Sequence, residues 1–208
     1  MTTFLFIRHG LTDAVGTSIV SWLPGVSLND RGRVQAEDLA RRLEHAPIAA
    51  LYSSPLERTM ETAAPAAKAL RLEIQVREAF GEVRFGDFSG KRLDALELSP
   101  EWKRYNQFRS GTRAPNGELM LEVQVRMVAE LERLREEHPG KLIAIFSHAD
   151  AIRATLAHYS GIPLDLLYRI EISPASVTAI EIADWGPRVL LVNHTGELPF
   201  VPPGQAVL

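Results

Sequence analysis

An arginine and a histidine stand side by side where a short apolar segment near the start of the chain ends. Residues 4–7 (Phe-Leu-Phe-Ile) are wholly apolar, which predicts a strand buried on both faces, and Arg8, His9 and Gly10 follow directly. A neutral imidazole can attack phosphorus, and a guanidinium can hydrogen-bond two phosphate oxygens through its planar fork. Arg8 and His9 therefore suit the transfer of a phosphoryl group from a phosphoester to His9.

Two more polar segments follow buried strands of the same kind. The apolar run 48–53 leads to Arg58, and the apolar run 142–146 leads to Ser147 and His148. Ligands of a parallel sheet bind beyond the carboxyl ends of its strands, so we expect these residues to meet at one edge of the sheet. Free N–H groups at the start of a helix, either the one containing Arg58 or the one after His148, would add to the positive field there. Such a pocket can neutralise a phosphoryl group without a metal.

Glu82 is the candidate proton donor for this chemistry. It lies in a glycine-punctuated loop, residues 80–90, where a carboxyl can protonate the leaving alkoxide and later activate the water that hydrolyses phosphohistidine. Glu78 and Asp87 are alternative carboxylates nearby, and a loop glutamate is ordinarily only solvated. His9 and Arg58 also have ordinary structural interpretations, as a hydrogen-bonded histidine at a strand end and as a surface arginine of a helix. The convergence of the candidate residues at one edge of the sheet favours the functional interpretation.

Strands alternate with helices along the chain, which predicts an α/β fold: a three-layer α/β/α sandwich with a mainly parallel mixed sheet. Ser54, Pro55 and Glu57 are typical of a helix start, as N-cap, first helical residue and capping-box glutamate. Val34 and Leu121 are expected on the buried stripes of their helices. The remaining predicted strands are residues 73–76, 177–183 and 188–193. The predicted helices run from Asn29 or Asp30 to residue 43, from Ser54 to about residue 70, over residues 118–137, and from after His148 to about residue 159.

The least regular stretch is an insertion of about residues 88–117, hereafter the cap insertion. Residues 93–98 and 100–108 can form short helices, and residues 111–117 read as a loop. We expect the insertion to pack over one end of the sheet as a small helical cap of a single domain spanning residues 1–208. Trp22, Trp102 and Tyr105 can line the pocket mouth or simply pack.

Composition excludes several classes of function. The chain of 208 residues has net charge −3 and no Cys, so it offers no thiolate chemistry and no global attraction for nucleic acid or a membrane surface. It lacks an apolar stretch of about 20 residues and a recognisable signal peptide, so we expect a cytoplasmic protein. His45, His138, His158 and His194 lack metal-ligand spacing, so neither a metal nor another cofactor is expected.

Four segments, in order along the chain, resemble the signatures of the histidine phosphatase superfamily, the phosphoglycerate-mutase-like fold. They are Leu5–Thr12, Ser53–Ala63, Glu82 with Phe85–Gly90, and Ser147–Ala149. The resemblance implies that His9 is phosphorylated and that Glu82 is the proton donor. It implies further that the phosphate or the rest of the substrate is held by a set of residues comprising Arg8, Gly10, Thr12, Arg58, Glu82, His148 and Ala149.

This sequence departs from the family pattern at three positions. Leu11 stands where many members carry Glu or Gln, Gly16 where an Asn often helps to bind phosphate, and Ala149 where Gly is common. None of the three removes a catalytic group, but they leave the outer pocket and the substrate open. The loop of residues 11–28 contains no Lys or Arg, which disfavours a second phosphate there.

Three functions agree with these residues. We favour a metal-independent phosphomonoesterase of the histidine acid type that acts on a small phosphorylated substrate. A cofactor-dependent phosphoglycerate mutase is less favoured, because the cap insertion has few cations for a second anionic group between residues 93 and 117, namely Lys103, Arg104, Arg109 and Arg113. The third is a phosphate- or phosphoprotein-binding module without turnover. The substrate stays open, and so does assembly, with a homodimer as one option.

Overall fold

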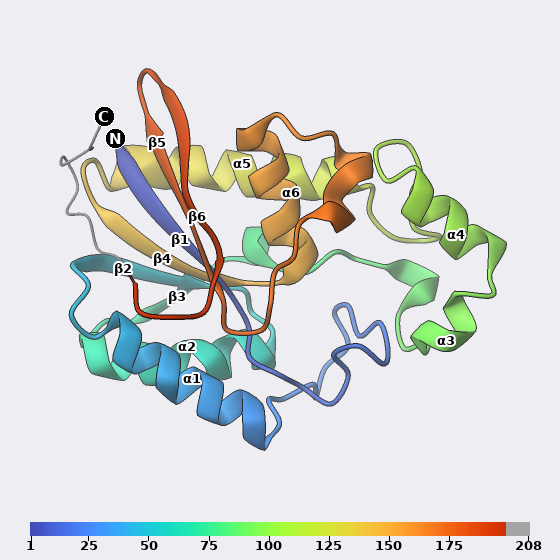
Figure 1. Ribbon diagram of the computed structural model, residues 1–208, viewed down its shortest axis with the longest axis horizontal. Helices are drawn as coiled ribbons and strands as arrows, with labels where there is room; N and C mark the ends of the chain where they lie inside the picture. The colour runs from blue at the N-terminus through green and yellow to red at the C-terminus, as the bar shows by residue number, and fades with distance from the viewer. Residues whose placement is uncertain (199–208) are drawn as a thin grey trace.

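The computed structural model describes residues 1–198. Its centre is a six-stranded sheet with the order β3-β2-β4-β1-β5-β6 (Figure 1). Strands β1, β2, β3 and β4 run parallel to one another, whereas β5 pairs antiparallel with both β1 and β6. The strands are β1 Thr2–Arg8, β2 Ile48–Ser53, β3 Ile74–Val76, β4 Leu142–Ser147, β5 Val177–Ala183 and β6 Gly186–His194. The predicted mainly parallel mixed sheet is confirmed.

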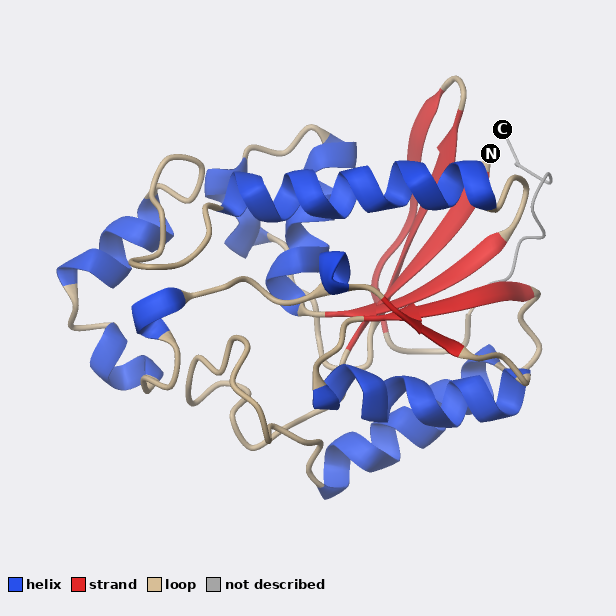
Figure 2. Ribbon diagram, turned by 180° about the vertical axis from the view of Figure 1, so that it is seen from behind, coloured by secondary structure: helices blue, strands red, loops and turns tan. Residues whose placement is uncertain are grey.

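Helices cover both faces of the sheet, as the prediction of three layers requires (Figure 2). Helices α1 (Asp30–Leu43) and α2 (Glu57–Leu70) lie on one face, and α5 (Met120–Glu137) and α6 (Ala149–Ser160) on the other. Successive residues of β1 point to opposite faces, so Leu5 and Ile7 join the core under α1 and α2 while Phe4 and Phe6 join the core under α5 and α6. The layered arrangement follows from these apolar strands buried on both sides.

The start of α2 differs from the prediction. The helix begins at Glu57, and its N-cap residue is Leu56, so Ser54 is not the N-cap, Pro55 is not a helical residue, and Glu57 forms no capping box. Both polar side chains have partners from other segments: the Ser54 hydroxyl lies 2.9 Å from Nε2 of His148, and the Glu57 carboxylate accepts a hydrogen bond from the Gly25 amide. Tertiary contacts have replaced the local cap.

Two residues assigned to buried helix stripes are exposed. Val34 of α1 is 61% exposed and Leu121 of α5 is 48% exposed. The faces that are buried are set by the register of each helix on the sheet. They consist of Gly32, Ala36, Leu39, Ala40 and Leu43 in α1, and of Met120, Val123, Met127, Leu131 and Leu134 in α5.

The cap insertion contains two short helices, α3 (Leu93–Leu96) and α4 (Pro100–Gln107), which stand apart from the four helices that flank the sheet (Figure 1). Trp102 and Tyr105 of α4 are buried against Phe85 and Phe88, with the Phe88 and Trp102 ring centroids 5.1 Å apart. Phe88 belongs to η2 (Gly86–Phe88), a short 3₁₀ helix, as are η1 (Glu78–Phe80) and η3 (Leu164–Arg169). Trp102 and Tyr105 therefore pack the cap instead of lining a pocket mouth.

None of the helices within residues 1–198 combines the length and the apolar character that a membrane crossing needs. The assignment of residues 1–208 to a single domain stays a prediction, as does the homodimer.

Candidate active site

His9 follows the last pair of the parallel ladder between β1 and β4, and its amide donates to the Ser147 carbonyl over 3.0 Å. The residue is 5% exposed, and its Nδ1 lies only 2.7 Å from the carbonyl oxygen of Gly10. A carbonyl can only accept a hydrogen bond, so Nδ1 must carry the proton and Nε2 the lone pair. Burial and the charges of Arg58 and Arg8 lower the pKa of His9 well below its usual value. The imidazole is thus held neutral with Nε2 ready to attack.

The backbone around His9 is fixed by two helices. The Gly10 amide donates to the hydroxyl of Thr62 on α2 over 2.9 Å. A Cβ on Gly10 would lie 2.8 Å from the carbonyl oxygen of Gly32, and a Cβ on Gly32 would collide with the backbone of Leu11. The close approach of the start of α1 to residues 10–11 therefore requires both glycines.

His148 faces His9, with ring centroids 5.3 Å apart. It is fully buried, its Nε2 lies 2.9 Å from the Ser54 hydroxyl, and its Nδ1 is buried with no hydrogen-bond partner among residues 1–198. Burial, reinforced by the charge of Arg58, lowers the pKa of His148 well below its usual value. His148 is also the N-cap residue of α6, and within the described residues no side chain caps this N-terminus, which begins with Ala149.

Arg8 and Arg58 are each anchored to the protein through one nitrogen. Nη2 of Arg58 donates to the Ser21 carbonyl over 2.9 Å, and Nη1 of Arg8 donates to the Ile172 carbonyl over 2.6 Å. Nε of both residues and Nη1 of Arg58 are buried without a partner in the described part of the chain, and so is the hydroxyl of Thr12. Buried donors without partners are costly and rare, so their convergence beside His9 indicates a ligand. We call Arg8, Arg58 and His148 around His9 the cradle.

Glu82 supplies the carboxyl group of the site. Its Oε1 accepts from the Val83 amide over 2.9 Å, and its carbonyl accepts from Nε1 of Trp22 and Nη2 of Arg126. Burial, together with the negative charge of Asp150, raises the pKa of Glu82 to about 7, against the opposing effect of the cradle arginines. A carboxyl with this pKa can give up and take back a proton near neutral pH.

The two alternative carboxylates lie outside this arrangement. Glu78 has a side chain that is 78% exposed and lies 3.6 Å from the Arg84 guanidinium. Asp87 is exposed and accepts hydrogen bonds from the side chain of Asn116. Neither has the burial that raises the pKa of Glu82.

Comparison with known proteins agrees with this geometry. Residues 4–195 match the histidine phosphatase superfamily (branch 1). The chain belongs to the histidine phosphatase superfamily. In a solved structure of YhfR from Bacillus stearothermophilus, which is 27% identical, the fold is the same, with a TM-score of 0.88 over 95% of this chain and 99% of that one.

Curated relatives of this member of the superfamily carry different names. The bifunctional protein Rv2228c of Mycobacterium tuberculosis is 33% identical over 95% of this chain, which spans only 55% of that protein. Phosphoserine phosphatase 1 of Hydrogenobacter thermophilus is 27% identical, with coverage of 95% and 96%. The probable phosphoglycerate mutase GpmB of Photorhabdus laumondii is also 27% identical, with coverage of 95% and 94%.

The histidine phosphatase fold brings most of the predicted site residues together. Arg8, His9, Arg58, Glu82 and His148 converge from β1, α2, the loop after η1 and the end of β4. The amide of Gly10 is used internally, by Thr62. No group of three or more His, Asp or Glu side chains among residues 1–198 is arranged to hold a metal. The roles assigned to these residues, and metal independence, remain predictions.

Two exposed cations in and after the loop of residues 80–90 are engaged by other side chains. Arg84 stacks on the Trp22 ring, with its guanidinium carbon 3.9 Å from the ring centroid, and Arg92 pairs with Asp94 over 2.8 Å.

Two polar residues of the site were not predicted from the sequence as site residues. Ser54 was interpreted as a helix cap, and Asp150 gave no sequence signal apart from its place two residues after His148.

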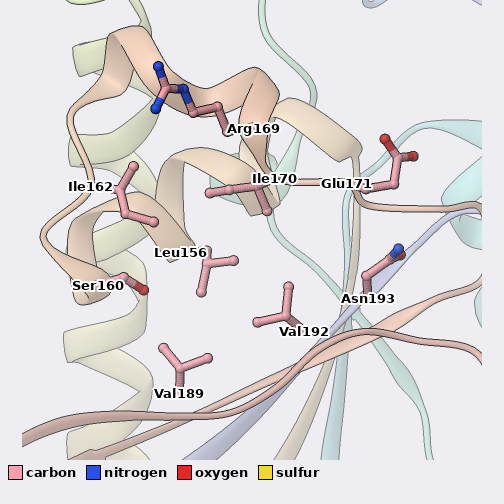
Figure 3. A pocket seen from close by; sticks show the side chains of 9 residues that line it. All are labelled: Leu156, Ser160, Ile162, Arg169, Ile170, Glu171, Val189, Val192 and Asn193. Atoms are coloured by element: carbon pink, nitrogen blue, oxygen red, sulfur yellow. The ribbon is translucent and has the colours of Figure 1, made fainter.

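An open pocket of about 350 Å³ lies between α6, the end of η3 and β6 (Figure 3). Its floor is apolar, from Leu156, Ile162, Ile170, Val189 and Val192, and polar groups at its edge include Arg169 and Glu171. It contains none of the predicted site residues.

Proposed function

We propose that this histidine phosphatase is a metal-independent phosphomonoesterase that acts on a small phosphoester through a phosphohistidine at His9. The observation that carries the proposal is the set of buried donors without protein partners on Arg8 and Arg58, together with the buried, unpartnered Nδ1 of His148, gathered around a neutral imidazole. Two guanidinium groups can neutralise the oxygens of a phosphoryl group and stabilise its transition state.

The residues suggest a two-step reaction. Nε2 of His9 attacks phosphorus, the bond between phosphorus and the ester oxygen breaks, and Glu82 donates a proton to the departing oxygen. A water molecule then gives a proton to Glu82 while its oxygen attacks the phosphorus of phosphohistidine. The bond between phosphorus and Nε2 breaks, inorganic phosphate leaves, and both residues return to their initial states.

Hydrolysis is favoured over mutase exchange by the partners of two cap cations. Arg109 is buried and paired with Asp150 over 2.9 Å, and Arg113 is paired with Glu122 over 2.7 Å. Neither has a free charge for a second phosphate or a substrate carboxylate. The name of the Hydrogenobacter relative supports a phosphatase, whereas the name of the Photorhabdus relative keeps mutase exchange as the second candidate.

The test is a phosphate-release assay in EDTA with p-nitrophenyl phosphate, phosphoserine and a panel of sugar phosphates, with His9→Ala as the control. We expect release by the wild-type protein and its loss in the variant. Conversion of 3-phosphoglycerate to 2-phosphoglycerate that depends on 2,3-bisphosphoglycerate would favour the mutase. Phosphate binding without turnover, unchanged in His9→Ala, would favour the binding module.

A further inference from the structure

Arg109 is a buried charge in a cap insertion whose other arginines, Arg92, Arg104 and Arg113, are exposed. The residue follows α4 and is 1% exposed, while its neighbour Phe108 is 51% exposed. Arginine is almost never fully buried unless it is paired. The function proposed above gives Arg109 no contact with the phosphoryl group, so its burial needs a separate explanation.

The contacts of Arg109 join three separate elements. Its Nη1 donates to Oδ2 of Asp150 on α6 over 2.9 Å. Its guanidinium carbon lies 4.4 Å from the ring centroid of Tyr105 on α4 and 4.7 Å from that of Tyr168 on η3. Nη2 also donates to Asn106 and to the Tyr168 hydroxyl. Arg109 therefore fixes the cap insertion on the start of α6.

Asp150 links this contact to the cradle. It lies two residues after His148, in the first turn of α6, and is buried. Its second carboxylate oxygen, Oδ1, accepts from Nη1 of Arg153 over 2.9 Å. Each carboxylate oxygen is thus held by a different arginine, one from the cap insertion and one from α6 itself.

The groups that face Glu82 come from several elements. Arg8 lies on β1, Arg58 on α2 and Asp150 on α6. Tyr105 of α4 is also near, and Arg126 of α5 donates to the carbonyl of Glu82. Asp150 is the acidic group among them, and its charge favours a protonated Glu82, whereas Arg8 and Arg58 favour the ionised form.

Packing alone gives a weak account of this buried pair. Replacing a buried ion pair by apolar side chains of similar size is often neutral or stabilising, because desolvation of the charges offsets their attraction. The hydroxyl of Ser147, three residues before Asp150, donates to the carbonyl of Phe80, two residues before Glu82, over 2.7 Å, so the start of α6 lies beside the loop that carries the proton donor. This placement suggests another role for the pair.

We propose that Arg109 is a positioning residue, which docks the cap insertion on Asp150 and sets the charge that Asp150 presents to Glu82. The proposal rests on the role of Glu82 as proton donor in the proposed function. Arg109 touches neither substrate nor reacting atoms and acts through Asp150.

The test is a titration of the Glu82 side chain in the free protein, followed by the ¹³C signal of its carboxyl carbon and assigned with Glu82→Gln. Asp150→Asn removes the negative charge and leaves Arg109 and Arg153 uncompensated, so the midpoint should fall by about one pH unit. Arg109→Met keeps an unbranched side chain between the two tyrosine rings but removes a positive charge. The midpoint should then rise, because Asp150 retains only Arg153.

The matched controls are Arg113→Gln and Glu122→Gln, which disrupt an exposed ion pair between the cap insertion and α5 that does not involve Asp150. Their midpoints should stay within about 0.3 pH unit of the wild-type value. The proposal is overturned if Asp150→Asn leaves the midpoint unchanged, or if both test variants move it in the same direction. Should circular dichroism show that Arg109→Met does not fold, the isosteric Asp150→Asn decides alone.

This titration needs no substrate, which separates the two proposals. A midpoint that moves as expected in a protein that hydrolyses no phosphoester supports the charge coupling and counts against the proposed function. Where hydrolysis is found, the alkaline limb of kcat/KM should move with the midpoint in each variant.

Discussion

The cradle and the cap insertion both use arginine, but they anchor it differently. In the cradle, Arg8 and Arg58 donate to the backbone carbonyls of Ile172 and Ser21. In the cap insertion, Arg109 and Arg113 are paired with carboxylates. A carbonyl fixes the guanidinium without cancelling its charge, whereas a carboxylate cancels it. An anion site therefore needs neutral anchors, and this difference separates a binding arginine from a structural one.

The largest expected effect is on the cradle itself. His9→Ala removes the nucleophile and should lower kcat by about 10⁴-fold, because the remaining groups can bind the substrate but cannot form phosphohistidine. The measurement is single-turnover phosphate release, together with the acid-labile phosphoenzyme that the wild-type protein should form. A variant that retains a tenth of the wild-type kcat would show that another residue carries the phosphoryl group.

A smaller loss should follow Arg58→Lys. The ammonium can keep the contact with the Ser21 carbonyl but cannot also offer two further planar donors, so kcat/KM should fall by about 10²-fold. Arg113→Lys is the matched control, since the exposed Arg113 pairs with Glu122, and it should stay within about twofold of the wild type. Equal losses in both variants would erase the proposed distinction between the cradle and the cap insertion.

The sequence predicts the part of the site that sits at strand ends. Arg8, His9 and His148 follow runs of apolar residues that can only be buried strands, so the parallel sheet brings them together. Arg58 was found for the same reason, although the helix start before it was misread. The layered arrangement of the sheet and its covering helices is predicted by the alternation of strands with helices along the chain.

What the sequence does not predict depends on contacts between distant segments. The serine of the pattern Ser54-Pro55-Leu56-Glu57 matches a helix cap, yet its hydroxyl meets His148, 94 residues away. Asp150 is held by Arg109, 41 residues before it. Local propensity depends on residues that are close in the sequence. It cannot show whether a side chain will bond a distant residue in the fold or cap a helix nearby.

The pH dependence tests the proton donor. Glu82 must be protonated for the first step, so with its pKa at about 7 the protonated fraction, and with it kcat/KM, should fall about tenfold per pH unit well above that value. His9 should not limit the rate at neutral pH, because its pKa lies well below the usual value. The measurement is kcat/KM from about pH 5 to pH 9 for an alkyl phosphate of the panel, such as phosphoserine, whose departing alkoxide needs the proton. The Glu82→Gln variant should have a lower kcat/KM that does not fall further at alkaline pH. A fall at alkaline pH that persists in this variant would belong to another group.

The smallest expected effect concerns the exposed cations of the cap insertion. Lys103 and Arg104 lie on the exposed side of α4, whose buried residues are Trp102 and Tyr105. If the substrate is a small monoester held by the cradle, the double charge reversal Lys103→Glu and Arg104→Glu should change KM by less than about twofold, because exposed charges are screened by solvent and salt. The measurement is KM at low and at high salt, with Lys68→Glu in the last turn of α2 as the control. A rise in KM of tenfold or more, confined to the cap variant and reduced by salt, would mean that these cations attract a second anionic group. It would move the balance toward mutase exchange.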